Sequence, residues 1–246
     1  MHLPPLGATN RAPEMDTKIQ AVLFDYGGTL DSDGVPWFQR FLAVYRTCGL
    51  DIGEEAFALA FYASDDNLRD RHALTQLGLE PTVRLQVEDV LALMAPDRAD
   101  LIAPVTQAFV TQTRRKLEEN RPILENLRRE GYRLGIVSNF YGNLEAILTG
   151  ENLRGLFDVV ADSAVVGATK PDPAIFRAAT DALGLCPERA CMVGDSIARD
   201  MNGAHNLRMP HVLLSRATQA CCDQAPVIRN LSGLAEALDQ WGKRLS

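Results

Sequence analysis

The chain has 246 residues, of which 46% are hydrophobic and 23% charged, a composition typical of a globular domain, with or without a smaller inserted one. Its net charge of −7 argues against binding to the phosphate backbone of DNA or RNA. No run approaches the roughly 18 consecutive apolar residues of a membrane span, so neither nucleic-acid nor membrane partners are expected.

Residues 1–17 contain three prolines and no apolar signal core, which indicates a flexible leader. The chain has an odd number of cysteines, none of them in Cys-x-x-Cys spacing, which favours reduced thiols and a cytoplasmic location. The adjacent Cys221 and Cys222 fall in an expected loop and suggest no metal site, because no matching histidine or cysteine cluster lies nearby.

The first expected element is a buried strand over Ile19–Phe24, followed by Asp25 and then by Tyr26-Gly27-Gly28-Thr29-Leu30. A carboxylate at the carboxyl end of a buried strand is accessible to a ligand. Backbone N–H groups of a glycine-rich turn can hold an anion. Asp25 is therefore the first candidate for a reactive group.

The segment from residue 35 to residue 119 shows helical spacing of apolar residues and no convincing strand. Trp37, Phe41 and Tyr45 illustrate the spacing at its beginning. We expect this insertion to form a second, helical domain. The predicted organisation is a leader over 1–17, an α/β core over 18–34 and 120–246, and the helical domain over 35–119.

Four further apolar runs predict strands, and helical patterns lie between most of them. The predicted strands are Arg133–Val137, Asp158–Ala161, Ala190–Val193 and His211–Leu214, and the predicted helices are Pro122–Gly131, Pro173–Leu183 and Ser196–Leu207. This alternation predicts a doubly wound α/β fold, in which a parallel sheet carries helices on both faces.

Two groups suited to a phosphate follow the second expected strand. The Ser138 hydroxyl, next to Asn139, stands at the strand terminus and can donate to a phosphoryl oxygen. Lys170 lies just before a rigid Pro-x-Pro helix entry, which makes its ammonium a fixed charge suited to a phosphate and a carboxylate together. Taken alone, Lys170 would also fit a surface position.

A second strand-end carboxylate, Asp195, follows the fourth expected strand, and Asp200 lies five residues later. Asp25 and Asp195 can share one Mg²⁺, because magnesium prefers oxygen ligands and needs few protein carboxylates. Asp195 also fits the role of N-cap for the next helix, and Asp25 that of a turn or helix cap.

These pieces occur in the same order as the motifs of the haloacid dehalogenase superfamily of hydrolases, which the chain resembles over Ile19–Leu214. The resemblance implies a Rossmann-like core, a helical cap at the first insertion point, and Mg²⁺-dependent hydrolysis of a small phosphorylated metabolite through an aspartyl phosphate, by a monomer or homodimer. It implies catalytic roles for Asp25, Ser138 and Lys170, substrate contacts for Gly28, Thr29, Ser138, Asn139 and Lys170, and metal ligands at Asp25, Gly27, Asp195 and Asp200.

Gly27 departs from the family pattern Asp-x-Asp-Gly-Thr, in which the second Asp is the acid and base. Glycine keeps the carbonyl that ligates the metal but loses proton transfer, which is worth about 10²–10⁴ in rate. Three replacements remain open: Asp31 or Asp33 folding back, a water in the vacated space, or a substrate with a good leaving group.

Three other interpretations also remain open. Dehalogenases of the superfamily carry a tyrosine in place of the second Asp, but here Tyr26 stands one position early. Phosphonate hydrolases carry a small residue there and need a cap lysine, for which the insertion offers only Lys116. A third possibility is a low-activity relative that binds a ligand or a protein partner. Within the insertion, Trp37 fits either a substrate platform or the core, and Arg69, Arg71 and His72 either an anion site or a solvated face.

Overall fold

The computed structural model describes residues 18–217 and 225–245, so the predicted leader and the Cys221–Cys222 pair lie outside it. Within the described residues, six parallel strands form one sheet in the order β3-β2-β1-β4-β5-β6. The strands are β1 Ala21–Phe24, β2 Arg133–Ser138, β3 Val159–Asp162, β4 Ala190–Gly194, β5 His211–Leu214 and β6 Val227–Ile228. β1 lies between β2 and β4, so Asp25 follows a strand that is paired on both sides.

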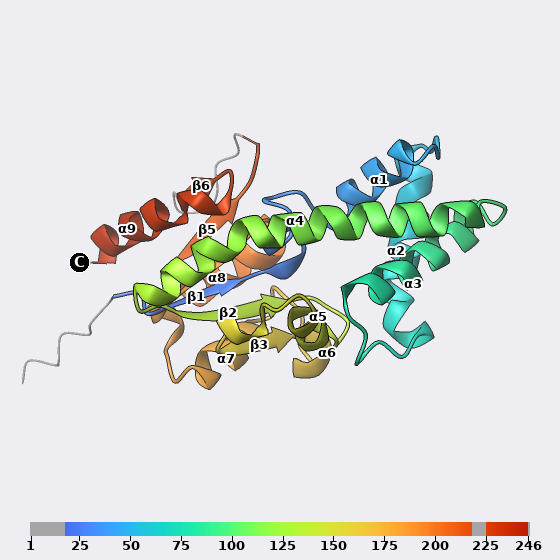
Figure 1. Ribbon diagram of the computed structural model, residues 1–246. Helices are drawn as coiled ribbons and strands as arrows, with labels where there is room; N and C mark the ends of the chain where they lie inside the picture. Colours follow the sequence, from blue (N-terminus) through green and yellow to red (C-terminus); the bar gives the residue numbers. More distant parts are fainter. Residues whose placement is uncertain (1–17, 218–224, 246) are drawn as a thin grey trace, which may run out of the picture.

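Four helices lie between β1 and β2, and shorter ones connect the later strands. The helices are α1 Trp37–Thr47, α2 Glu54–Arg71, α3 Leu79–Met94, α4 Ile102–Arg129, α5 Leu144–Gly150, α6 Ser163–Val166, α7 Pro173–Ala182, α8 Asn202–Asn206 and α9 Leu234–Leu245. In Figure 1, α1, α2 and α3 gather around one end of the long helix α4, and the strands lie beside its other end. None of the helices in the described ranges is both long enough and apolar enough to span a membrane.

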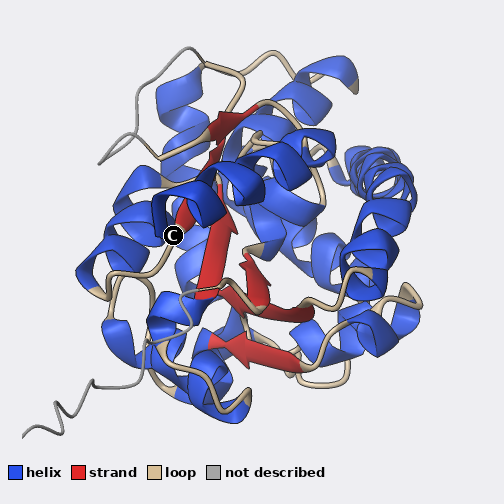
Figure 2. Cartoon of the chain, turned by 90° about the vertical axis from the view of Figure 1, so that its left-hand side faces the viewer, coloured by secondary structure: helices blue, strands red, loops and turns tan. Residues whose placement is uncertain are grey.

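The sheet is covered on both faces, as Figure 2 shows with helices on either side of the strands. Successive side chains of β1 point to opposite faces. Val22 and Phe24 belong to the apolar cluster that includes α4, α5 and α9, whereas Ala21 and Leu23 pack with α7 and α8. This arrangement confirms the predicted doubly wound α/β fold.

The five predicted strands all form, with ends that differ by two residues or fewer. β6 was not predicted, because two residues are too few to give an apolar run. The predicted helix 196–207 forms as a π-helical turn over Ile197–Met201 that continues into α8. The segment 35–119 contains helices and no strand in the structure, as expected.

The prediction that a helix begins at Pro122 is wrong, because Pro122 lies inside α4. A proline inside a helix removes one backbone hydrogen bond and costs about 3 kcal/mol. Leu117 before it and Leu124 and Leu127 after it are all buried in the same apolar cluster, so tertiary packing holds the helix together through the proline. The domain boundary at residue 119 stays a prediction, but α4 crosses it without a break.

A buried ion pair joins the glycine turn to the helical insertion. Asp31 Oδ2 accepts from Arg40 Nη1 of α1 at 2.6 Å, and its Oδ1 accepts from Gly28 N at 2.7 Å. Arg40 also donates to Thr113 Oγ1 of α4 at 2.6 Å and lies 4.1 Å from the centroid of the Phe109 ring. One guanidinium therefore holds the turn and two insertion helices together.

We expect Arg40→Met to lower the free energy of unfolding by about 3–5 kcal/mol, because it leaves the buried Asp31 carboxylate without its cation. Urea denaturation near neutral pH measures the loss. Arg84→Met is the matched control: Arg84 pairs with Glu88 on the surface of α3, and its loss should cost about 1 kcal/mol or less. Equal losses in the two variants would contradict this account of the Arg40–Asp31 pair.

Candidate active site

Asp25 lies where β1 ends, and its position is fixed from two neighbouring strands. Its backbone N donates to the Val193 carbonyl of β4 at 2.9 Å. Its Oδ1 accepts from Ser138 Oγ, at the end of β2, at 2.7 Å and lies 2.8 Å from Lys170 Nζ. Asp25 is 5% exposed. The residues predicted to converge with Asp25 at the sheet edge therefore do so.

Lys170 is held as a fixed charge. Its Nζ lies 2.6 Å from Asp200 Oδ1 in addition to its contact with Asp25. The side-chain amide of Asn139 clamps the Lys170 backbone: Asn139 Oδ1 accepts from Lys170 N at 2.7 Å, and Asn139 Nδ2 donates to the Lys170 carbonyl at 3.2 Å. The structure thus gives Asn139 a positioning role, and its predicted contact with substrate stays a prediction.

Three carboxylates gather around this lysine. One oxygen each of Asp25, Asp195 and Asp200 lies within 4.8 Å of the others. Burial, together with the charges of Asp25 and Asp200, raises the pKa of Asp195 to about 8. Burial also raises the pKa of Asp200, although Lys170 opposes it. Three carboxyl groups thus share one ammonium group, and Asp195 keeps its proton to a higher pH than an exposed carboxyl does.

The donor set fits a hard divalent cation such as Mg²⁺. Its ligands would be oxygens, which magnesium prefers, and a doubly charged ion would remove the repulsion that raises the pKa of Asp195. Burial tends to lower the pKa of Lys170, but Asp200 and Asp25 outweigh burial and raise it, so the lysine stays charged beside them. Asp25, Asp195 and Asp200 are the residues that would hold the ion.

Gly28 is required by geometry at this point. Its φ is +95°, a conformation that other residues rarely adopt, and an added Cβ would lie 2.5 Å from Asp195 Oδ2. Its N–H donates to Asp31, and Thr29 Oγ1 donates to Asp195 Oδ1 at 3.4 Å. Both residues therefore contact carboxylates of the chain, and their predicted contacts with substrate stay predictions.

A cavity of about 160 Å³ lies between the strand ends and the helical insertion. Asp25, Gly27, Ser138 and Lys170 line it from the core. Aromatic rings make up much of the opposite wall. The remaining lining residues are Pro36, Trp37, Phe38, Phe61, Tyr62, Asp65, Asn139, Phe140, Tyr141 and Arg199.

Trp37 fills the space that a side chain at position 27 would enter. A Cβ on Gly27 would lie 3.1 Å from Trp37 Nε1 and 3.3 Å from its Cδ1. The indole Nε1 donates to Asp31 Oδ2 at 2.6 Å, and the ring packs edge-on against Phe109 and Phe140. Trp37 is thus a partly buried residue that packs against the core and also lines the cavity.

Neither carboxylate that was considered as a replacement for the missing acid lines this cavity. Asp31 accepts from Gly28, Trp37 and Arg40. Asp33 Oδ2 lies 2.7 Å from Lys116 Nζ of α4. Each carboxylate pairs with a cation outside the cavity lining, so neither is placed to transfer a proton at Asp25.

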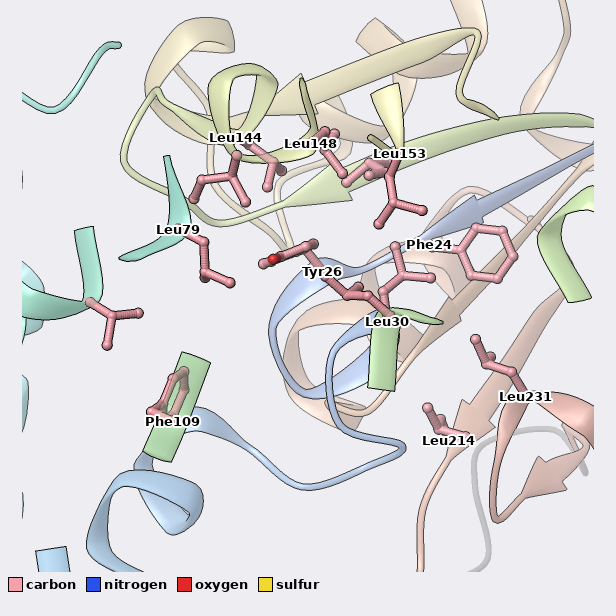
Figure 3. Packing of buried hydrophobic residues seen from close by; sticks show 14 of the residues in the cluster. Phe24, Tyr26, Leu30, Leu79, Phe109, Leu144, Leu148, Leu153, Leu214 and Leu231 are labelled. Carbon is pink, nitrogen blue, oxygen red and sulfur yellow. The ribbon is translucent and has the colours of Figure 1, made fainter. Parts of the chain in front are cut away.

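The residues on which the dehalogenase and phosphonate interpretations depended also lie outside the cavity lining. Tyr26 is buried in the apolar cluster, where Figure 3 shows it among Leu30, Leu79 and Leu144. Lys116 pairs with Asp33 and Glu119. Neither the tyrosine of the dehalogenase interpretation nor the lysine of the phosphonate interpretation is therefore among the described residues that line the cavity at Asp25.

Sequence reasoning missed Asp65, Tyr141 and Arg199, which all line the cavity. A signal existed for Asp65: it lies four residues after Phe61 and so continues the apolar face of α2. A charged residue on such a face calls for a buried partner. Tyr141 lies in the connection after β2, where the sequence gives no periodic pattern. Arg199 lies in the predicted helix 196–207, whose sequence does not indicate that this side chain lines the cavity.

The basic cluster of the insertion has other partners. Arg71 Nη1 and His72 Nε2 lie 3.5 Å and 3.2 Å from Asp89 Oδ2 of α3. Arg69 lines a neighbouring pocket, and Asp65 lines both this pocket and the cavity. Arg71 and His72 therefore pair within the insertion rather than line the cavity.

Comparison with known proteins supports the arrangement. A family model described as haloacid dehalogenase-like hydrolase matches residues 19–208. Phosphatase MT3486 of Mycobacterium tuberculosis is 31% identical over 226 residues, which covers 91% of this chain and 99% of that protein. Haloacid dehalogenase-like hydrolase domain-containing protein 3 of Mus musculus is 37% identical over 152 residues, which is 59% of each chain. The solved structure of a HAD phosphatase from Thermococcus onnurineus matches with 28% identity and a TM-score of 0.51, over 89% of this chain and 98% of that one.

We expect Gly27→Ala to lower the free energy of unfolding by about 1–3 kcal/mol, because the new methyl group presses on the packed Trp37 ring. The backbone at Gly27 (φ −77°, ψ 117°) suits any residue, so the loss reports on the indole alone. Gly155→Ala, where no atom lies within 4 Å of the added Cβ, should change stability by about 0.5 kcal/mol or less. Urea denaturation of both variants checks this, and an unaffected Gly27→Ala protein would contradict it.

We expect Mg²⁺ to raise the melting temperature, and to raise it more at pH 8 than at pH 6. The raised pKa of Asp195 means that the folded protein keeps a proton that the unfolded chain loses near its ordinary pKa of about 4. Metal-free stability therefore falls as pH rises from about 4 towards 8, and protons compete with the cation over the same range. A hundredfold excess of Mg²⁺ over its Kd corresponds to about 2.7 kcal/mol.

Thermal melts with and without Mg²⁺ at the two pH values measure this effect. Asp195→Asn should lose the Mg²⁺ response, whereas the exposed Asp181→Asn of α7 should keep it. A response that is equal at both pH values, or that survives in Asp195→Asn, would count against the carboxylate cluster as the binding site.

Proposed function

The chain belongs to the haloacid dehalogenase-like hydrolases, and from this premise we propose that it is a Mg²⁺-dependent phosphohydrolase that acts through Asp25. The observation that carries the proposal is that one oxygen of Asp25 contacts both a hydroxyl and an ammonium group. Asp25 Oδ1 accepts from Ser138 and contacts Lys170, which in turn contacts Asp200. The Mycobacterium tuberculosis relative that matches nearly end to end is a protein named as a phosphatase.

The proposed reaction begins with attack of the Asp25 carboxylate on phosphorus, which forms an aspartyl phosphate and releases the alcohol. Lys170 offsets the phosphoryl charge, and the Ser138 hydroxyl orients the group. Mg²⁺ bound by Asp25, Asp195 and Asp200, with the Gly27 carbonyl as a further ligand, would supply additional charge neutralisation. Water then attacks the aspartyl phosphate and regenerates Asp25.

The cavity supports a small substrate with an apolar or aromatic part. The lining between the reactive carboxylate and the insertion includes the rings of Trp37, Phe38 and Phe140, which favour apolar or aromatic groups. Arg199, on the same lining, adds a positive charge for an anionic substrate. We therefore propose a compact phosphate monoester as substrate.

A pure binding function is less well supported. A module that only binds a ligand has no need for a nucleophile held at the strand ends beside two further carboxylates. The intact set of Asp25, Ser138, Lys170 and Asp195 therefore favours turnover.

We expect the protein to hydrolyse 4-nitrophenyl phosphate in the presence of Mg²⁺, and to stop when EDTA removes the metal. Asp25→Asn should reduce the rate below detection, because it removes the nucleophile, while Asp181→Asn should match the unmodified chain. Trapping of a phosphorylated protein after acid quench, followed by mapping of the phosphate to Asp25, tests the intermediate. Activity retained in Asp25→Asn would rule out the covalent route.

A further inference from the structure

The cavity contains one carboxyl group besides the proposed nucleophile. Among the described residues that line it, Asp25 and Asp65 are the only two acidic side chains. Asp65 belongs to α2, so it approaches from the helical insertion rather than from the strand ends. The cavity also contains Gly27, where the family pattern has a carboxylate that this chain lacks.

The orientation of Asp65 is set by two other elements. Its Oδ1 accepts from the Tyr141 hydroxyl, which follows β2, and from Gln86 Nε2 of α3 at 3.2 Å. Gln86 is fully buried, so this contact holds α2 and α3 in a fixed relation. No donor contacts Oδ2 in the described part of the chain, which leaves that oxygen available to a ligand.

The electrostatic setting of Asp65 suits a proton donor. Burial raises its pKa above that of an exposed carboxyl, and the neighbouring Asp66 adds to the effect, although Tyr141, Gln86 and Arg199 oppose it. A carboxyl with a raised pKa remains protonated closer to neutral pH, which general acid catalysis requires.

The other groups near the reaction centre are committed elsewhere. Asp31 and Asp33 are bound to Arg40 and Lys116. Lys170 lies between two carboxylates, where it is held in its charged form. The Trp37 indole lies close to the position that a Cβ on Gly27 would take, and Asp65 is the carboxyl group other than Asp25 among the described residues that line the cavity.

We propose that Asp65 is the general acid and base of the reaction, supplied by the helical insertion in place of a carboxylate at position 27. The inference rests on the proposed phosphohydrolase function. In the first step, Asp25 forms a bond to phosphorus, the ester O–P bond breaks, and the Asp65 proton passes to the departing oxygen. In the second step, the Asp65 carboxylate takes a proton from water as that oxygen bonds to phosphorus, and phosphate leaves Asp25.

The test compares two esters of similar size that differ in their need for an acid. Nitrophenolate leaves from 4-nitrophenyl phosphate without a proton, whereas the alkoxide of 2-phenylethyl phosphate requires one. The measured quantity is kcat/KM, which covers events up to release of the alcohol and excludes hydrolysis of the intermediate. Asp65→Asn should lower kcat/KM about 10²–10⁴-fold for the phenylethyl ester and only a few-fold for the nitrophenyl ester.

Asp70→Asn is the matched control, because it makes the same substitution further along α2, where the side chain is exposed and is not among the charges that act on Asp65. It should leave kcat/KM for both esters unchanged. Thermal melts of Asp65→Asn establish that the variant folds. The amide introduced by Asp65→Asn retains an oxygen that can accept from Tyr141, so the packing of α2 should persist.

Three outcomes would overturn the inference. These are equal losses for both esters in Asp65→Asn, no loss for either, or an unmodified protein that hydrolyses only the nitrophenyl ester. The same experiment separates this inference from the proposed function. If Asp25→Asn is inactive while Asp65→Asn affects both esters alike, the nucleophile stands and only the role of Asp65 fails. If Asp25→Asn remains active, the proposed function is wrong, and the inference about Asp65 that rests on it is wrong as well.

Discussion

The constraint on which the rest of the site depends is the burial of three carboxylates around one ammonium. Asp25, Asp195 and Asp200 reach the same small region because each follows or closely follows a strand of one parallel sheet. Lys170 is the side chain that contacts two of them, and Asn139 holds its backbone in place. Three carboxyl groups beside one ammonium group favour a bound cation, and under the proposed function a phosphoryl group would bind together with that cation.

The glycine turn shows how the local sequence and the insertion depend on one another. Asp31 accepts from the turn, from Trp37 and from Arg40, so the same carboxylate shapes the turn and orients α1. The indole it holds occupies the space beside Gly27. A side chain at position 27 and a tryptophan at position 37 compete for one volume, and this chain has the tryptophan.

The sequence was sufficient to predict the sheet and the residues at its edge, because buried parallel strands appear as short apolar runs and Asp25, Ser138 and Asp195 stand at the ends of such runs. The sequence was not sufficient where packing between distant segments determines the local structure. α4 continues through Pro122 because buried leucines lie on both sides of the proline. Asp65 and Tyr141 are 76 positions apart in the sequence, and no local pattern predicts the hydrogen bond between them. β6 forms by pairing with β5, and its two residues give no apolar run from which a strand could be predicted.

The uninterrupted course of α4 has a mechanical consequence. Helix α4 packs against the sheet at one end and against α1 and α3 at the other. It therefore sets the spacing between the helical insertion, which carries Asp65, and the end of β1, which carries Asp25. Pro122 removes one backbone hydrogen bond from α4, and bends in helices occur most often at such positions. A bend at Pro122 would shift the insertion relative to the sheet, by an amount that grows with the distance from the proline.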